Sequence, residues 1–84
     1  MSTHSEIKLY GAQRCHKTRF YQSFLEQKNL AYQYLDVEQN ADVAEELRGL
    51  YLNRKLHFPT LVVGDKSLRN PTEQDLNKWI HKLK

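Results

Sequence analysis

The sequence predicts a small α/β domain built around one mixed four-stranded sheet. Short runs of strand-forming residues alternate with segments whose apolar residues recur at helical spacing. The last two strand runs are separated only by Gly64-Asp65, a pair typical of a two-residue hairpin turn. Strands separated by helices favour parallel crossovers, whereas a tight turn makes antiparallel neighbours. The expected order is therefore strand, helix, strand, helix, strand, strand, helix, in a single domain that spans residues 1–84.

The bounds of these elements follow from local signals. The chain of 84 residues is long enough for one hydrophobic core. Gly11 ends the first apolar run, and Pro59 is tolerated at the start of a strand because no ladder N–H is needed there. Residues 1–5 are expected to be a flexible N-terminus. The expected strands are residues 7–10, 30–37, 58–63 and 66–69, and the expected helices are residues 16–28, 41–53 and 71–83.

The first two expected helices each carry an apolar face. In the first, Phe20 with Phe24 and Tyr21 with Leu25 form pairs four residues apart. In the second, Asn40 can cap the N-terminus by accepting hydrogen bonds from backbone N–H groups. The stripe of the second helix that is expected to face the sheet comprises Val43, Leu47, Leu50 and Tyr51.

The last expected helix has a clear start signal. Asn70 is expected to be the N-cap, Pro71 the first helical residue, and Glu73 the residue that completes a capping box. The apolar stripe that would pack this helix on the sheet comprises Leu76, Trp79, Ile80 and Leu83.

The chain has one cysteine, Cys15, between the first strand and the first helix. At a helix N-terminus, unpaired backbone N–H groups and the macrodipole favour a thiolate over a thiol. Arg14, Lys17 and Arg19, with His16 when protonated, lie within about one helical turn of the sulfur. A helix terminus stabilises a charge by only about 0.3–1 kcal/mol, whereas a shift of one pKa unit requires about 1.36 kcal/mol. The dipole, the cations and the N–H donors must therefore act together to keep most of the thiol ionised at neutral pH. The sequence therefore indicates a reactive thiolate rather than a small buried hydrophobe.

The composition limits the cellular compartments and the classes of protein that fit this sequence. One cysteine excludes an internal disulfide and a cysteine-rich zinc site within one chain, and it suits a reducing compartment. No apolar run approaches the roughly 20 residues of a membrane span, and residues 1–8 contain no signal-peptide core. We therefore expect a soluble cytoplasmic protein without a membrane partner.

Charge and histidine placement predict neither a nucleic-acid partner nor a metal site. The formal net charge is +3, but basic residues are scattered and interleaved with acids, and no nucleic-acid motif is present. A basic surface that attracts anionic substrates explains the net positive charge equally well. The four histidines, which are His4, His16, His57 and His81, show no metal-ligand spacing on one face.

Five segments of the chain together carry a recognisable pattern, which comprises Leu9-Tyr10-Gly11 leading to Cys15, Leu30-Ala31-Tyr32, Leu35-Asp36-Val37-Glu38, Phe58-Pro59-Thr60, and Leu68-Arg69-Asn70-Pro71-Thr72. In this order, the segments resemble the glutaredoxin family of thioredoxin-like proteins, and most of all its mycoredoxin-type members. The resemblance extends from Ile7 to Leu83. It implies the thioredoxin-like fold, with helices on both faces of the sheet.

The resemblance implies thiol–disulfide exchange with Cys15 as nucleophile. Dithiol members have a second cysteine three positions later, where this chain has Thr18. This is a monothiol form, whose mixed disulfide must be cleared by an external thiol such as glutathione. The expected substrates are protein mixed disulfides. We also expect a monomeric protein without a tightly bound cofactor. Arg14, Lys17 and Thr18, whose hydroxyl can donate to the sulfur, are expected to stabilise the thiolate.

The resemblance also implies a groove for the thiol substrate. Phe58, Pro59 and Thr60 would shape it, with a cis bond before Pro59, and His57 would lie near Cys15 and tune its pKa. Many glutaredoxins carry a Gly-Gly pair before the last helix, where this chain has Arg69-Asn70. The candidate partners for the carboxylates of a bound thiol are Asn70 and Thr72 at a helix N-terminus, and Gln13, Lys17, Arg54 and Lys55.

A binding module remains the alternative interpretation. Some monothiol glutaredoxins share an iron–sulfur cluster between subunits through a Cys-Gly-Phe-Ser motif, which this chain lacks. A single cysteine can still join a cluster that bridges a dimer, because the remaining thiolates can come from outside. A non-catalytic thiol sensor is the other form of this alternative.

Overall fold

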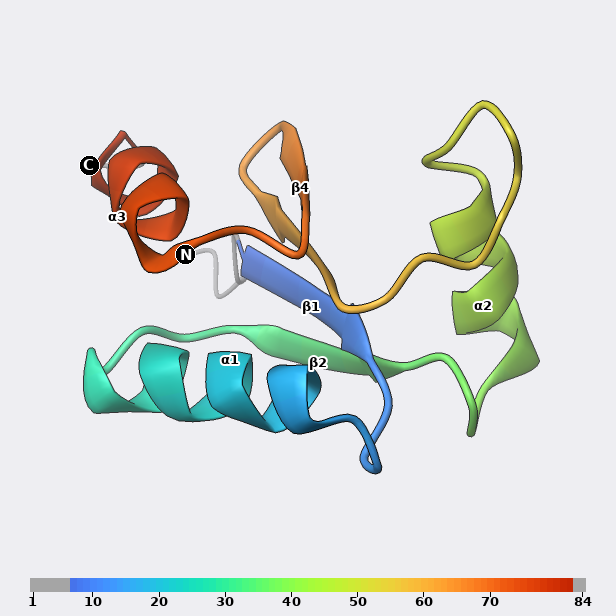
Figure 1. Ribbon diagram of the computed structural model, residues 1–84, viewed down its shortest axis with the longest axis horizontal. Helices are drawn as coiled ribbons and strands as arrows, with labels where there is room; N and C mark the ends of the chain where they lie inside the picture. Colours follow the sequence, from blue (N-terminus) through green and yellow to red (C-terminus); the bar gives the residue numbers. More distant parts are fainter. Residues whose placement is uncertain (1–6, 83–84) are drawn as a thin grey trace, which may run out of the picture.

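The computed structural model describes residues 7–82 and has the predicted order of elements. The sheet has four strands in the order β2-β1-β3-β4, and three helices pack on it (Figure 1). The expected flexible N-terminus at residues 1–5, and Leu83, lie outside the described residues. The strands are β1 (Ile7–Gly11), β2 (Gln33–Asp36), β3 (Thr60–Val63) and β4 (Lys66–Arg69), and the helices are α1 (His16–Gln27), α2 (Ala41–Arg48) and α3 (Glu73–His81).

The sheet is mixed, as predicted. Strand β1 is central and pairs in parallel with β2, with Leu9 opposite Tyr34. On its other side β1 pairs antiparallel with β3, with Leu9 opposite Leu61. The tight turn at Gly64-Asp65 makes β3 and β4 antiparallel neighbours, and Gly64 has a φ of 62° that suits such a turn.

The connection through α2 differs from the expectation of a parallel crossover. Tyr10, near the end of β1, pairs with Thr60, the first residue of β3. The chain therefore leaves β2 and enters β3 at the same end of the sheet, because α2 lies beside that end and does not carry the chain back to the other (Figure 1). As a result Pro59 lies at the end of the sheet where the loop to Cys15 begins.

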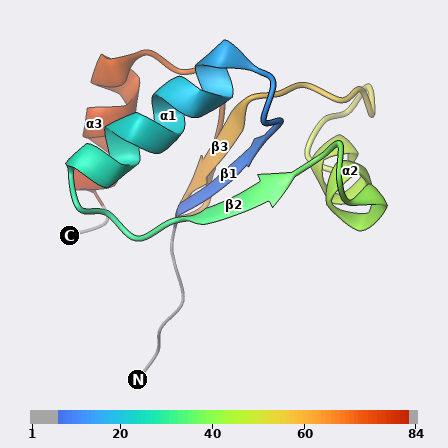
Figure 2. The same cartoon turned by 90° about the horizontal axis from the view of Figure 1, so that it is seen from below.

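Two hydrophobic cores lie on opposite faces of the sheet, which confirms helices on both faces. Leu61 and Val63 of β3 belong to the core beneath α1 and α3, whereas Val62 between them packs against the core of α2. Figure 2 shows α1 and α3 together on one side and α2 apart from them. Burying one leucine or valine side chain contributes about 1.5–3 kcal/mol, so both cores are needed to stabilise so small a domain.

Helix α1 presents only part of the expected apolar face to the core. Tyr21 and Leu25 are buried, but Phe20 is 46% exposed and Phe24 is only partly buried. The third buried residue of the helix is Thr18, which is fully buried. The inward face is thus defined by residues 18, 21 and 25, which follow helical spacing but include a polar position that hydropathy does not mark.

Several segments are shorter than predicted. Strands β2 and β3 begin at Gln33 and Thr60. Helix α2 ends at Arg48 because the chain continues from Gly49 in tight turns, with the N–H of Tyr51 bonded to the carbonyl of Arg48. The expectation that Leu50 faces the sheet is therefore wrong, since its side chain is 41% exposed. None of the helices between residues 7 and 82 has the length and apolar character that a bilayer crossing requires.

The start of α3 corrects the predicted cap. Thr72 is the N-cap, and its hydroxyl accepts from the backbone N–H of Asp75 at 3.1 Å. Asn70 has a φ of 49°, which lies in the left-handed region and is incompatible with the extended conformation of an N-cap. Pro71 is buried before the helix begins, and its carbonyl lies 2.5 Å from the Tyr21 hydroxyl of α1. Asn70 therefore shapes the turn into α3 and does not cap it.

Candidate functional site

Cys15 is the N-cap of α1, as the sequence predicts for its sulfur at a helix N-terminus. Its backbone is extended, with φ −88° and ψ 120°, and its carbonyl accepts from the N–H of Arg19 at 3.2 Å. The N–H of Cys15 donates to the carbonyl of Ala12 at 3.0 Å, which closes the turn between β1 and the helix. The side chain is partly exposed. The sulfur is therefore both accessible and placed at the positive end of the helix dipole.

The surroundings of Cys15 lower the pKa of its thiol. Burial acts in the opposite direction and raises it, but the Thr18 hydroxyl, the backbone N–H groups of Thr18 and Lys17, and the charge of Arg14 together outweigh burial. These donors favour the thiolate because they stabilise its negative charge. Lys17 contributes through its backbone N–H.

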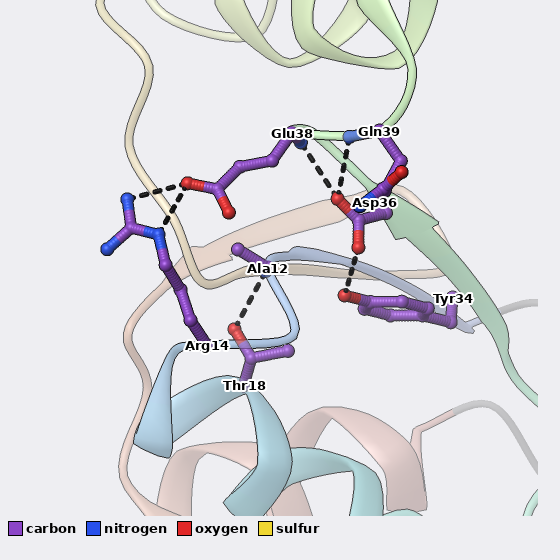
Figure 3. Close-up of polar contacts among 7 residues, drawn as sticks. All are labelled: Ala12, Arg14, Thr18, Tyr34, Asp36, Glu38 and Gln39. Carbon is purple, nitrogen blue, oxygen red and sulfur yellow. Dashed lines mark hydrogen bonds and ion pairs between the residues drawn. The ribbon is translucent and has the colours of Figure 1, made fainter.

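Thr18 connects the active loop to the helix through one buried hydroxyl. Its Oγ1 accepts from the backbone N–H of Ala12 at 3.2 Å (Figure 3). A hydroxyl has one donor and two acceptor positions, so Oγ1 can accept from Ala12 and still donate to the sulfur. Gly11 gives the Thr18 side chain its space, since a Cβ at Gly11 would come within 2.6 Å of the Thr18 Cγ2 and closer still to Oγ1.

Arg14 shares its charge with a carboxylate. Its Nε and Nη2 lie 2.7 Å and 2.6 Å from the Oε2 of Glu38, and Figure 3 shows the guanidinium turned toward that residue. Both side chains are in contact with solvent, so the pair contributes little to stability. It does fix the Arg14 charge beside the loop, where that charge is the weakest of the influences that lower the pKa of Cys15.

The carboxylate of Asp36 holds two loops together at this end of the sheet. Its Oδ1 accepts from the N–H groups of Glu38 and Gln39 at 2.8 Å and 2.9 Å, and its Oδ2 accepts from the Tyr34 hydroxyl at 3.0 Å (Figure 3). Burial raises the pKa of Asp36, but hydrogen bonds from these groups and from the Gln13 N–H lower it further than burial raises it. The loop before Cys15 is thereby tied to the turn after β2.

Replacing Asp36 with asparagine is expected to destabilise the fold in a pH-dependent manner. A carboxylate whose pKa is lowered in the folded state stabilises that state above its ordinary pKa of about 3.9. The stabilisation is lost as the pH falls through the lowered pKa of the folded protein. Urea unfolding of both proteins at pH 7, 4 and 2.5 should show a difference in the free energy of unfolding that is largest at pH 7 and decreases as the pH falls. An equal difference at all three pH values would contradict this role.

A cavity of about 280 Å³ opens beside Cys15. Cys15 and Lys17 line it from α1, residues 56–59 line it from the loop before β3, and Arg69 and Asn70 line it from the end of β4. Three separate segments of the chain therefore meet at the sulfur.

The structure brings some of the expected groove residues together and leaves others out. Phe58, Pro59 and Asn70 line the cavity, and the Phe58–Pro59 bond is cis, as the resemblance implies. Thr60 is fully buried, and its hydroxyl lies 2.7 Å from both the Tyr51 hydroxyl and the His57 carbonyl, which it reaches as donor. Four of the expected residues lie outside the lining, namely Gln13, Arg54, Lys55 and Thr72. Gln13 and Thr72 are exposed, and Arg54 pairs with Glu45.

His57 lines the cavity without a charge at neutral pH. Burial lowers its pKa, and the nearby positive charges of Arg69 and Lys55 lower it further. Its ring packs edge-on against Tyr51, with centroids 4.6 Å apart. A neutral imidazole offers no charge to the thiolate, so the structure does not support the expectation that His57 tunes the pKa of Cys15.

Two lining residues were not among the predicted site residues. Leu56 carries no sequence signal that distinguishes it from an ordinary loop residue. Arg69 had a signal, because it stands where the resemblance expects glycine. Asn70 stands where the family pattern has the second glycine, and its φ is positive. Asparagine can take this position because it tolerates a positive φ better than most residues. Asn70 also donates its N–H to the Pro59 carbonyl at 3.1 Å.

No cluster of three metal-ligating side chains is found among residues 7–82. Cys15 is the single described thiol, and its neighbours are donors and cations, which stabilise anions. The chemistry that this arrangement supports is nucleophilic attack by a thiolate.

Comparison with known proteins gives the family. The profile of the glutaredoxin family matches residues 7–68. The crystal structure of the thioredoxin-like protein BC3987 is 25% identical and has a TM-score of 0.74, with 87% of this chain and 97% of that chain covered. The structure of a glutaredoxin from Archaeoglobus fulgidus has a TM-score of 0.78 at 19% identity, with 93% and 88% covered, which shows a shared fold. No curated protein matches the sequence. Because the family profile covers most of the chain, from the first strand to β4, this protein belongs to the glutaredoxin family.

Proposed function

We propose that the protein is a monothiol thiol–disulfide oxidoreductase that removes a low-molecular-weight thiol from mixed disulfides. The observation that carries the proposal is the partly exposed Cys15 at the start of α1, with donors that lower the pKa of its thiol and a cavity at its side. Membership of the glutaredoxin family supports the reaction class. The monothiol subtype, the likeness to mycoredoxin-type members and the use of glutathione or a similar co-substrate are parts of the proposal.

The reaction needs one protein thiol and one external thiol. The Cys15 thiolate attacks the sulfur of the small thiol in a mixed disulfide, forms a new disulfide with it, and releases the other half as a thiolate. A second small thiolate then attacks the sulfur bound to Cys15, which produces a small-molecule disulfide and regenerates the Cys15 thiolate. Thr18 occupies the position of a resolving cysteine, so both steps rely on intermolecular exchange.

The residues of the site have distinct proposed roles in this cycle. The Thr18 hydroxyl, the N–H groups of Thr18 and Lys17, and the Arg14 charge hold the thiolate form. Phe58, Pro59 and Asn70 form the wall along which the disulfide would lie. A reducing compartment such as the cytoplasm suits the cycle, because it supplies the reduced small thiol.

The test is turnover of a glutathione mixed disulfide of a small peptide with excess glutathione at pH 7. The natural protein should release the peptide thiol catalytically, and the Cys15→Ser variant should give only the uncatalysed rate. Thermal unfolding of the variant controls for folding, since serine is nearly isosteric at this partly exposed position. Equal rates for both proteins, with glutathione and with mycothiol as the external thiol, would exclude the proposed reaction.

A further inference from the structure

The cavity beside Cys15 is lined by basic groups without acidic partners. Lys17 and Arg69 line it, together with the neutral imidazole of His57, and no carboxylate contributes to its wall. Within residues 7–82, neither Lys17 nor Arg69 forms an ion pair. By contrast, the described arginines at positions 14, 48 and 54 each pair with a glutamate. Apart from the Cys15 thiolate, no described anionic side chain lines the cavity beside these positive charges.

The lowered pKa of His57, which lines the same cavity, is consistent with positive charge at this wall. After burial, the charge of Arg69 is the next cause of the lowered pKa of His57. A field that disfavours a second positive charge at this wall favours a negative one at the same place. A guanidinium can also hold a carboxylate through two parallel hydrogen bonds, which adds geometric selection to the attraction.

Arg69 lines the same cavity as Cys15, where the mixed disulfide would react. Arg69 is the last residue of β4 and pairs with Thr60, the residue after Pro59. The neighbouring Leu68 points into the core beneath α1 and α3, so Arg69 lies on the opposite face of the sheet. Where the family pattern has glycine, this chain thus adds a cationic side chain to the wall of the site.

The size of the cavity limits the ligand. At about 280 Å³ it is just below the roughly 300–1,000 Å³ of ligand pockets, which suits a short thiol and not a large cofactor. A thiol with a carboxylate a few bonds from its sulfur would bring that group to the wall while its sulfur meets Cys15.

We propose that Arg69, assisted by Lys17, is a specificity-determining residue that selects thiols and mixed disulfides carrying a carboxylate close to the sulfur. This inference rests on the proposed function, because selection is expressed through exchange at Cys15. The bonds that form and break are those of the proposed cycle, and the carboxylate remains unchanged throughout.

The experiment compares three mixed disulfides that differ only in the charge of the small thiol. A neutral cysteine peptide is joined to 3-mercaptopropionate, 2-mercaptoethanol or cysteamine, and release of the peptide is measured with excess 2-mercaptoethanol as the external thiol. The natural protein is expected to have a kcat/KM about tenfold higher for the anionic disulfide than for the cationic one, with the neutral one between. The Cys15→Ser variant supplies the uncatalysed rate.

Substitution at Arg69 tests the assignment. Arg69→Gln should reduce the anionic-to-cationic ratio about fivefold or more, and Arg69→Lys should restore part of it. Arg48→Gln is the matched control, because it removes the same charge from α2, outside the cavity, and should leave the ratio unchanged. The neutral disulfide is the internal reference for folding of each variant.

The outcomes separate this inference from the proposed function. Turnover of all three disulfides without a charge preference, or a preference that Arg69→Gln leaves intact, would overturn the role of Arg69 and leave the reaction in place. An equal loss of preference in Arg69→Gln and Arg48→Gln would show steering by the net charge and would also overturn it. Absence of turnover that depends on Cys15 with any of the disulfides would instead reject the reaction itself.

Discussion

Replacing Thr18 with valine is expected to slow alkylation of Cys15 about five- to tenfold at pH 6 and to move the midpoint of its pH profile upward. The Thr18 hydroxyl is one of the donors that lower the pKa of the thiol, and a hydrogen bond to a charged group contributes about 1.5–3 kcal/mol. At pH 6 the variant has a smaller fraction of thiolate, although the thiolate that remains is more basic and more nucleophilic. The alkylation rate still falls, because the gain in nucleophilicity offsets only about half of the loss of thiolate. Alkylation by iodoacetamide between pH 5 and 9 measures the profile.

Thr18→Ser is the matched control for this experiment. Serine retains the hydroxyl that accepts from the Ala12 N–H and removes only the methyl group, so its profile should follow that of the natural protein. Thr18→Val leaves the buried Ala12 N–H without its partner and should also lower the free energy of unfolding by about 1–3 kcal/mol in urea. A folded valine variant with an unchanged pH profile would show that the hydroxyl does not act on the sulfur.

Replacing Gly11 with alanine is expected to lower the free energy of unfolding by about 1–3 kcal/mol. The new methyl group would meet the fully buried Thr18 side chain, with Cγ2 at 2.6 Å and Oγ1 closer still. Gly11 cannot move away easily, since its carbonyl accepts from the Val37 N–H at 2.9 Å. For a domain of this size, each kcal/mol corresponds to a change of about 4–8 °C in Tm. Thermal unfolding followed by circular dichroism measures the loss.

Two further variants show whether the clash with Thr18 is the cause. Gly49→Ala is the glycine control, because its Cβ would lie 3.3 Å from the Glu46 carbonyl at a helix end with ordinary αR backbone, and it should cost far less. In a Thr18→Ala background, Gly11→Ala should cost less than in the natural protein, because Oγ1 and Cγ2, the two nearest of the colliding atoms, are gone. Additive losses in the double variant would refute the proposed contact.

The parts of the fold that sequence analysis predicts are those set by neighbouring residues. Cys15 was placed at a helix N-terminus because Gly11 and the helical pattern after it are local signals. The antiparallel pair of β3 and β4 followed in the same way from Gly64-Asp65. Asn40 caps α2 as predicted, with its side chain accepting from Asp42 and Val43.

The errors arise where distant segments decide the conformation. Asn70 has the residue type of an N-cap, but its N–H bonds to Pro59 and its side chain lies 3.2 Å from the Tyr21 hydroxyl, and both contacts require the assembled sheet. Thr60 was assigned to the groove from its place beside Pro59, whereas strand pairing turns its side chain inward. The direction of β3 likewise depends on which end of the sheet α2 occupies, which hydropathy does not encode.

The entry of β3 at the end of the sheet where β1 finishes makes Cys15 a reporter of complete folding. The turn around the sulfur is local, but the opposite wall of its cavity comes from residues far along the chain, beside Pro59 and Arg69. Contacts of such long sequence separation form only after the loop-closure entropy between them has been overcome. A partly folded chain could therefore present a thiol without a cavity, and substrate selection would begin only when the last strands have docked.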